Sequence, residues 1–127
     1  MYQTCYSLTK KTCSDQLSYI EVVGNIKNKE LTVVSIMSFE KNKGHATNLM
    51  IHACREYLTY FNNPDVKLYL DDCSDRFRNP HNLYKKLGMI YNDTTGPEMT
   101  GSVQHVSNLP ISLSKNLIIR QLSHTEF

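Results

Sequence analysis

The sequence predicts an α/β fold in which helices flank one mixed β-sheet. Two β-rich segments near the N-terminus are separated by a polar turn, which predicts an antiparallel hairpin. A long amphipathic segment follows, and apolar segments of strand length then alternate with a second helical segment. The chain has 127 residues, so we expect one domain over residues 1–127.

The predicted hairpin comprises residues 17–26 and 31–39, both rich in Val, Ile and Tyr. The residues between them, 27–30, read Lys-Asn-Lys-Glu and predict the turn. Residues 1–8 predict a third strand, with residues 9–15 as its loop.

The amphipathic helix has the most regular pattern in the chain. Apolar side chains recur every three or four positions from Ala46 to Phe61, while His52, Arg55 and Glu56 occupy the opposite face. Two asparagines and a proline at 62–64 predict its end. The predicted apolar face comprises Ala46, Leu49, Met50, Ala53, Cys54, Tyr57, Leu58 and Phe61.

A strand at residues 66–70 and a polar loop at 71–75 precede a second predicted helix. Asn79 suits its N-cap, Pro80 its first position and Gly88 the left-handed position after its last turn. The buried stripe of this helix comprises Leu83, Tyr84 and Leu87.

The C-terminal third predicts two further strands. Residues 89–91 begin one, and residues 111–122 supply the last apolar segment. Residues 92–101 hold two glycines and a proline, which predict a loop.

The composition disfavours several classes of protein. Fourteen Lys and Arg against twelve Asp and Glu give a formal charge of +2, and the pI near 8.3 lies below the value of about 9 typical of nucleic-acid-binding domains. Nucleic-acid binding through the lysines and tyrosines is therefore the least favoured interpretation. No apolar run approaches the ~18 residues that span a membrane, and the first eleven residues lack a signal-peptide core. We expect a cytoplasmic protein, with a nuclear location as the other option.

The cysteines give no sign of a metal site. Cys5, Cys13, Cys54 and Cys73 contain no C-x-x-C pair, and no Cys or His falls at zinc-finger spacing. We expect free thiols, with Cys54 in the core, and no metal cofactor.

A basic loop, residues 41–47, joins the second hairpin strand to the long helix. The first backbone N–H groups of a helix lack intrahelical acceptors and carry the positive end of its dipole, so a phosphate group can bind there. Gly44 permits close approach of a ligand, and Lys41 and Lys43 add positive charge. The loop matches neither the P-loop nor the dinucleotide-binding pattern. A pyrophosphate site and a solvated loop are the two interpretations from these residues alone.

The loop resembles the acetyl-coenzyme A signature of the GNAT N-acetyltransferase superfamily, [Q/R]-x-x-G-x-[G/A], which stands here as Lys41-x-x-Gly44-x-Ala46. Lysine at the first of these positions keeps a cation but loses the planar hydrogen bonding of Gln or Arg. Residues 83–89, Leu-Tyr-Lys-Lys-Leu-Gly-Met, look like a second segment of that superfamily, L-Y-x-K-x-G-F. The resemblance covers about residues 31–91.

The resemblance implies a GNAT-like mixed sheet flanked by helices. Two helices usually precede the hairpin in that family, whereas about fifteen residues precede it here, so these helices are expected to be reduced or missing. Phe77 also stands where the family often has Asn. A second copy of the chain in a homodimer, or the tail after Gly101, would then complete the acceptor side of the cleft.

The resemblance further implies direct transfer of acetyl from acetyl-CoA, as cosubstrate, to a primary amine on a small molecule or a protein. The strand before the loop would bind pantetheine through its backbone, and the loop and first helical turn would surround the pyrophosphate. The implied cofactor-binding residues are Val34, Ser35, Ile36, Lys41, Asn42, Lys43, Gly44, His45, Ala46 and Thr47.

Two catalytic roles follow from the same resemblance. Tyr84 would protonate the departing thiolate, and Asp71 would take the proton of the attacking amine. Asp72, Glu40 and water are the other candidates for the base. Asp72 would face the opposite side of a regular strand from Asp71, and His45 is expected to be exposed or to touch cofactor phosphate. The alternative function is a CoA-binding regulatory or interaction module with little or no turnover.

Overall fold

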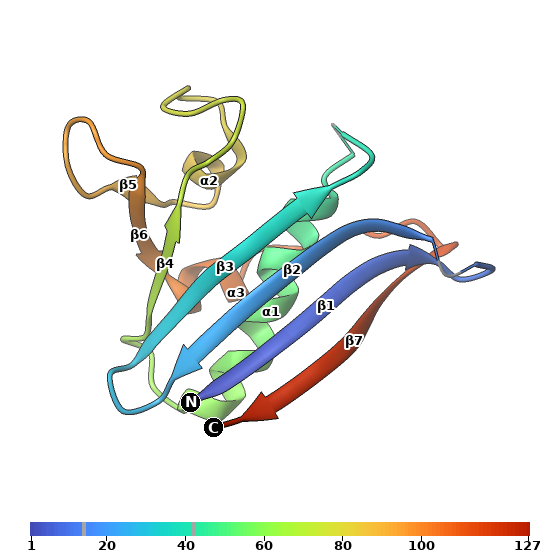
Figure 1. Ribbon diagram of the computed structural model, residues 1–127, viewed down its shortest axis with the longest axis horizontal. Helices are drawn as coiled ribbons and strands as arrows, with labels where there is room; N and C mark the ends of the chain where they lie inside the picture. Colours follow the sequence, from blue (N-terminus) through green and yellow to red (C-terminus); the bar gives the residue numbers. More distant parts are fainter. Residues whose placement is uncertain (14, 42) are drawn as a thin grey trace.

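The computed structural model describes residues 1–13, 15–41 and 43–127, which form an α/β fold with a seven-stranded mixed sheet and three helices (Figure 1). The strands lie across the sheet in the order β5-β6-β4-β3-β2-β1-β7. The elements in chain order are β1 (Tyr2–Lys10), β2 (Gln16–Asn25), β3 (Glu30–Ser38), α1 (His45–Phe61), β4 (Lys67–Asp71), α2 (Leu83–Lys86), β5 (Ile90–Tyr91), β6 (Glu98–Ser102), α3 (Val103–Ser107) and β7 (Leu117–Glu126).

The predicted hairpin and the strand before it are confirmed. The strands β1, β2 and β3 pair in antiparallel order, and every second side chain of β2 is buried. The buried side chains face α1, and α1 and α3 lie on the same side of the sheet (Figure 1). The core therefore lies between these two helices and one face of the sheet.

The long helix is also confirmed, because α1 spans His45–Phe61 and buries most of its predicted apolar stripe against the sheet, with Ala46 and Leu58 only partly buried. Asn62 ends it in the left-handed conformation at φ 47°, and its N–H donates to the Leu58 carbonyl. Tyr57 is fully buried, and its hydroxyl lies 2.6 Å from Thr4 Oγ1 of β1. Packing and a buried hydrogen bond thus fix α1 against the sheet.

The strands β3 and β4 are parallel neighbours for only three residue pairs, from Glu30 with Lys67 to Thr32 with Tyr69. Beyond these pairs the two strands diverge (Figure 1). On its other edge β3 carries a register shift at Val34, which interrupts its pairing with β2. A bulge bends a strand and increases its twist, so it accompanies the separation of β3 from β4.

The prediction for residues 92–101 was wrong at its C-terminal end. Residues 98–102 form β6, which pairs with both β4 and β5, and Met99 is fully buried. The loop was predicted too long because Gly96 and Pro97 belong to the turn, which ends before β6 begins. At Gly101 the missing side chain leaves room for Met89, whose Cγ would lie 2.8 Å from an added Cβ.

The last strand was also misplaced, since β7 covers Leu117–Glu126 rather than residues 111–122. The apolar residues Ile111 and Leu113 pack against the core outside regular structure. Strand β7 pairs along the length of β1, and the Met1 ammonium donates to the Phe127 carbonyl at 2.8 Å. Within the described residues, no helix is long and apolar enough to cross a membrane.

The start of α2 differs from the prediction as well. Asn82, not Asn79, is its N-cap, and its side chain accepts from the Lys85 N–H at 2.9 Å. The Asn79 side chain accepts from the His81 N–H at 2.8 Å in a separate turn. Gly88 adopts the predicted left-handed conformation at φ 84°.

Replacing Gly24 with Ala should destabilise the protein by about 3 kcal/mol, because the new Cβ would lie 2.2 Å from the Tyr57 ring, which is fully buried. Urea denaturation would measure the change. The control is Gly96→Ala, whose Cβ would meet only the end of the exposed Asp93 side chain and should cost less than about 1 kcal/mol. Equal losses in the two variants would contradict this packing.

Candidate functional site

A cleft of about 1470 Å³ lies where β3 and β4 separate. One wall consists of β3 and the loop that leads into α1. The other wall consists of β4, the loop that follows it, and α2. The short parallel pairing of these two strands therefore leaves this cleft between them.

The described residues that the sequence singled out for cofactor binding all line this cleft. Asn42 is also one of the predicted residues, but it lies outside the described part of the chain. The two predicted catalytic residues, Asp71 and Tyr84, line the same cleft. The cofactor-binding set that lines it comprises Val34, Ser35, Ile36, Lys41, Lys43, Gly44, His45, Ala46 and Thr47.

The cleft-facing edge of β3 has strand pairing only as far as Thr32. Residues 33–38 continue in extended conformation without a strand partner on that side among the described residues. Val34 lies at the bulge and is 56% exposed. This unpaired edge presents backbone N–H and C=O groups that an extended ligand could bind as another strand would.

The N-terminus of α1 opens into the same cleft. Gly44 precedes the helix at φ 75°, no side chain caps the helix, and a Cβ at this position would meet nothing within 4 Å. The first backbone hydrogen bond of the helix runs from the Asn48 N–H to the Gly44 carbonyl at 3.1 Å. The N–H groups of the first turn precede this bond and suit an anion.

His45 is 5% exposed, so the expectation of exposure was wrong. Its Nε2 lies 3.0 Å from Glu40 Oε1, and its Nδ1 is buried without a hydrogen-bond partner among the described residues. The ring lines both the cleft and a smaller cavity behind it. Its pairing with a loop carboxylate, which the sequence does not reveal, draws it inward.

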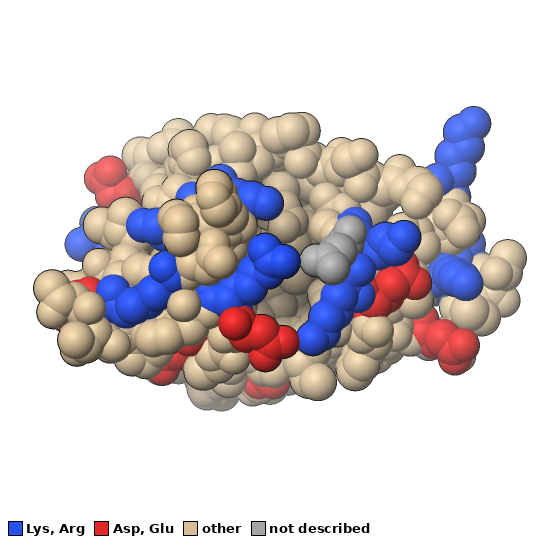
Figure 2. Space-filling model, turned by 90° about the horizontal axis from the view of Figure 1, so that it is seen from above, with Lys and Arg blue, Asp and Glu red and all other residues tan. Residues whose placement is uncertain are grey.

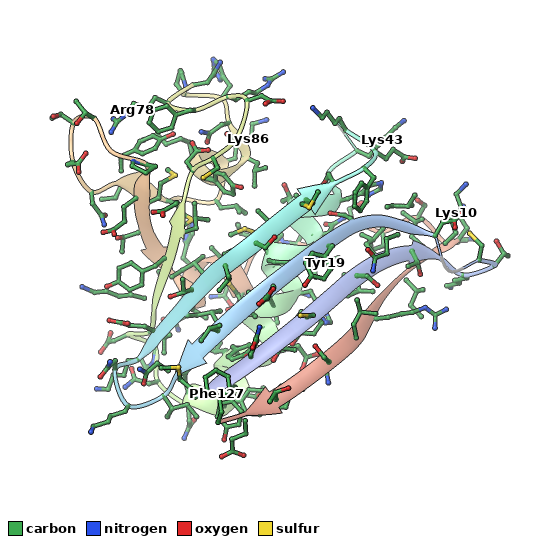
Figure 3. The ribbon with its side chains drawn as sticks, viewed as in Figure 1. Lys10, Tyr19, Lys43, Arg78, Lys86 and Phe127 are labelled. Atoms are coloured by element: carbon green, nitrogen blue, oxygen red, sulfur yellow. The ribbon has the colours of Figure 1, made fainter. Side chains whose placement is uncertain are left out.

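Basic side chains lie on both sides of the mouth of the cleft, together with the carboxylates of Glu40 and Asp75. Lys and Arg side chains gather around a hollow in the view from above (Figure 2), and Lys43 and Lys86 project from opposite sides of the space between β3 and β4 (Figure 3). Lys41 Nζ lies 3.1 Å from Asp75 Oδ2 and so joins the loops that follow these two strands. Both side chains of this pair are highly exposed, so the pair adds little stability.

Tyr84 is 5% exposed and lines the cleft from α2. Burial raises its pKa to about 12, and the negative charge of Asp72 adds to the effect. No hydrogen bond engages its hydroxyl among the described residues, and this oxygen is not one of the fully buried atoms that lack a partner. The phenol is therefore protonated at neutral pH and free to donate to a ligand.

Asp72 does not line the cleft but holds together the loop behind it. It is 3% exposed and accepts hydrogen bonds from Ser74 Oγ at 2.5 Å, from Asn82 Nδ2 at 3.0 Å and from the Tyr91 hydroxyl. Burial raises the pKa of this carboxyl, but hydrogen bonds from Ser74 and Tyr91 outweigh burial and lower the pKa below its ordinary value. Asp72 is thus a structural anion that links β4, α2 and β5.

Asp71 faces the cleft instead, from the end of β4. In the register of β4 and β6 it lies directly opposite Glu98, which also lines the cleft. Glu98 was missed because residues 92–101 were predicted to be a loop. The polar-apolar-polar order of Glu98, Met99 and Thr100 is the signal that could have revealed a strand there.

The remaining polar groups do not point to a metal or an activated thiol. Among the residues that the structure describes, no three His, Cys, Asp or Glu side chains cluster to hold a metal ion. All four cysteines are free, and burial raises the pKa of the Cys54 thiol to about 12. Cys54 is therefore a core side chain without nucleophilic character at neutral pH.

The C-terminal tail does not complete the cleft. Strand β7 lies at the far edge of the sheet, and α3 packs on α1. Within the described chain, the lining of the cleft includes no residue after Glu98. The sequence suggested that either a second copy of the chain or the tail after Gly101 would complete the cleft. The prediction for the tail is therefore wrong.

Comparison with known proteins gave no relatives. Searches of protein-family models, curated proteins and solved structures each found no match to the chain.

Replacing Asp72 with Ala should lower the free energy of unfolding by about 3 kcal/mol, because buried donors of Asn82 and Tyr91 would lose their acceptor. Asp71→Ala, at the exposed neighbouring position, should lower the free energy of unfolding by less than about 0.5 kcal/mol. Urea denaturation of both variants measures the contrast.

The loss of stability caused by Asp72→Ala should depend on pH in one direction. Because folding lowers the pKa of Asp72, its contribution is present above the unfolded pKa of about 4 and is lost as pH falls through the lower folded pKa. The gap between wild type and Asp72→Ala should therefore narrow below about pH 4. A gap that widens on acidification would contradict the assigned role.

Proposed function

We propose that the protein is an N-acetyltransferase of the GNAT type, which transfers acetyl from acetyl-CoA to a primary amine. The observation that carries this proposal is the cleft between diverging parallel strands, with the N-terminus of α1 on one wall and Tyr84 on the other. The GNAT resemblance implies this arrangement, because the strand before its cofactor loop separates from its neighbour. The two sequence motifs line opposite walls of one cleft.

The cleft offers a suitable group for each part of the cofactor. The amide groups of pantetheine would pair with the free backbone edge of β3 at residues 33–36. The pyrophosphate would accept hydrogen bonds from the first turn of α1 after Gly44. Lys43 and Lys86 at the mouth would balance the negative charge of the phosphates.

The proposed chemistry is direct attack in a ternary complex. The neutral amine nitrogen forms a bond to the thioester carbonyl carbon, and the bond from that carbon to sulfur breaks. Tyr84 donates its proton to the departing thiolate and regains one from solvent. The extra proton of the amine passes to Asp71 or to water.

The structure disfavours some of the candidates for the general base that takes the proton of the amine. Asp72 is saturated with hydrogen bonds and does not line the cleft, so it is unsuited to accept a substrate proton. Glu40 lines the cleft but pairs with His45. Asp71 lines the cleft, and no side-chain hydrogen bond engages it among the described residues.

The second candidate is a CoA-binding module without turnover. It is favoured by the sheet face opposite α1, where described residues such as Val34 and Met37 are more than half exposed and no helix covers them. Thiol release from acetyl-CoA with a panel of amines separates the two functions. Binding of acetyl-CoA without thiol release above background would favour the module.

Gly44→Asp should abolish acetyl-CoA binding, because it places a carboxylate beside the proposed pyrophosphate position. Isothermal titration with acetyl-CoA measures the loss. The matched control is Gly44→Ala, which has the same strained φ of 75° but no charge and finds nothing within 4 Å of its Cβ. We expect the Ala variant to bind within about tenfold of wild type, and wild-type affinity of the Asp variant would disprove the loop assignment.

Tyr84→Phe should lower kcat by about 10²-fold or more and leave acetyl-CoA affinity nearly unchanged, since it removes only the proton donor. The loss should stay constant from about pH 7 to about pH 10, because the pKa of Tyr84 is raised to about 12. Tyr60→Phe on the exposed side of α1 serves as the control. Equal kcat in wild type and Tyr84→Phe would reject Tyr84 as the acid.

A further inference from the structure

We propose that the smaller cavity behind the N-terminus of α1 is a binding site for a small divalent oxyanion, either free inorganic phosphate or the phosphate group of a small metabolite. The cavity has a volume of about 260 Å³. Glu40, Lys43 and His45 line both this cavity and the cleft, and the rest of its lining comes from the ends of β1 and β2, from α1 and from residues 112–117. The proposed acetyl transfer makes no use of this second cavity.

The ring of His45 supplies a buried nitrogen that lacks a partner. The residue is 5% exposed, and its Nδ1 is buried without a hydrogen bond among the described residues, although buried polar atoms are normally paired. Its Nε2 lies 3.0 Å from Glu40 Oε1, and because an ionised carboxylate only accepts hydrogen bonds, Nε2 carries a proton. Nδ1 is therefore the atom of this ring that is left for a ligand.

Two lysines bring positive charge to the cavity. Lys10 ends β1 and Lys43 lies in the loop before α1, and both are found at the same end of the sheet (Figure 3). Neither lysine forms a salt bridge within the described chain. Glu40 is the acidic residue of the lining, and its carboxylate is paired with His45. When His45 is protonated this pair is neutral, and the two remaining ammonium groups match the charge of a dianion.

The wall formed by residues 112–117 is fixed in place and adds neutral donors. The buried Asn48 amide donates to the Ser112 carbonyl at 3.0 Å and accepts from the Ser112 N–H at 3.3 Å, which ties this segment to α1. Ser114 and Asn116 also line the cavity, and no side-chain hydrogen bond engages either of them in the described part of the chain. A hydroxyl and an amide are donors that suit the oxygens of an oxyanion.

Binding at this site should take up a proton. Since Nε2–H donates to Glu40, Nδ1 donates to an oxyanion only in the imidazolium form of His45. The other titratable side chains that line the cavity are Lys10, Glu40 and Lys43. The affinity for sulfate, which keeps its double charge throughout the range in which histidines titrate, should therefore fall as pH rises.

The test titrates sodium sulfate into the wild type, Lys10→Gln and Lys11→Gln at an ionic strength held constant with sodium chloride. Lys11 is the matched control, because it is the next residue and equally exposed but does not line the cavity. Isothermal titration gives the affinity, and ¹⁵N NMR of the imidazole reports the protonation of Nδ1. Lys10→Gln should weaken sulfate binding about tenfold, and Lys11→Gln should leave it unchanged.

Saturating sulfate should also move the Nδ1 signal of His45 from the unprotonated to the protonated position. Equal sulfate affinity in the two lysine variants, or no sulfate binding by the wild type, would overturn the site. Inorganic phosphate and glycerol 3-phosphate then distinguish the two sources of the anion. Tighter binding of the ester supports a site for a small phosphorylated metabolite, and tighter binding of the free ion supports a phosphate site.

Titration of acetyl-CoA into the same three proteins separates this site from the proposed cofactor site. Unchanged acetyl-CoA affinity in Lys10→Gln supports two separate sites. A loss of acetyl-CoA affinity in Lys10→Gln alone would assign the cavity to the phosphates of the cofactor and overturn a separate site. If acetyl-CoA binds to none of the three proteins, the acetyltransferase proposal fails, while selective loss of sulfate binding in Lys10→Gln still supports the oxyanion site.

Discussion

The three-residue pairing between β3 and β4 is the constraint on which the other features depend. If these parallel strands paired along their full length, the backbone edge at residues 33–38 would be occupied and the cleft would close. The bulge at Val34 and the turn into α1 bend the chain away from β4. Cleft, free strand edge and open helix N-terminus therefore have one geometric origin.

The buried carboxylate of Asp72 supports the wall that faces this edge. Its hydrogen bonds join the loop after β4 to the N-cap of α2 and to β5, so they fix the one-turn helix that carries Tyr84. A four-residue helix has little stability of its own. The two neighbouring aspartates at the end of β4 therefore have different roles. Asp72 points into the protein and orders the wall of the cleft, while Asp71 points into the cleft.

Patterns with many repeats were predictable from the sequence, and features that depend on single contacts were not. The stripe from Ala46 to Phe61 and the Val, Ile and Tyr content of residues 17–26 predicted the larger elements correctly. Asn79 and Asn82 are equally good caps in the sequence, and only the contact of Asn82 with Asp72 selects one. The strand that contains Glu98 was not predicted, because its pairing with β4 outweighs the glycines and the proline of residues 92–101. His45 is buried by its pairing with Glu40, which no periodicity records.

The pairing of β7 with β1 bears on how the chain reaches this structure. It joins residues up to 124 positions apart, from Tyr2 to Glu126, whereas β1, β2, β3 and α1 are close in sequence. Contacts of high sequence separation form slowly because a long loop must close first. The edge of β1 therefore stays open on a growing or refolding chain until β7 pairs with it, and during that interval this edge can pair with another chain.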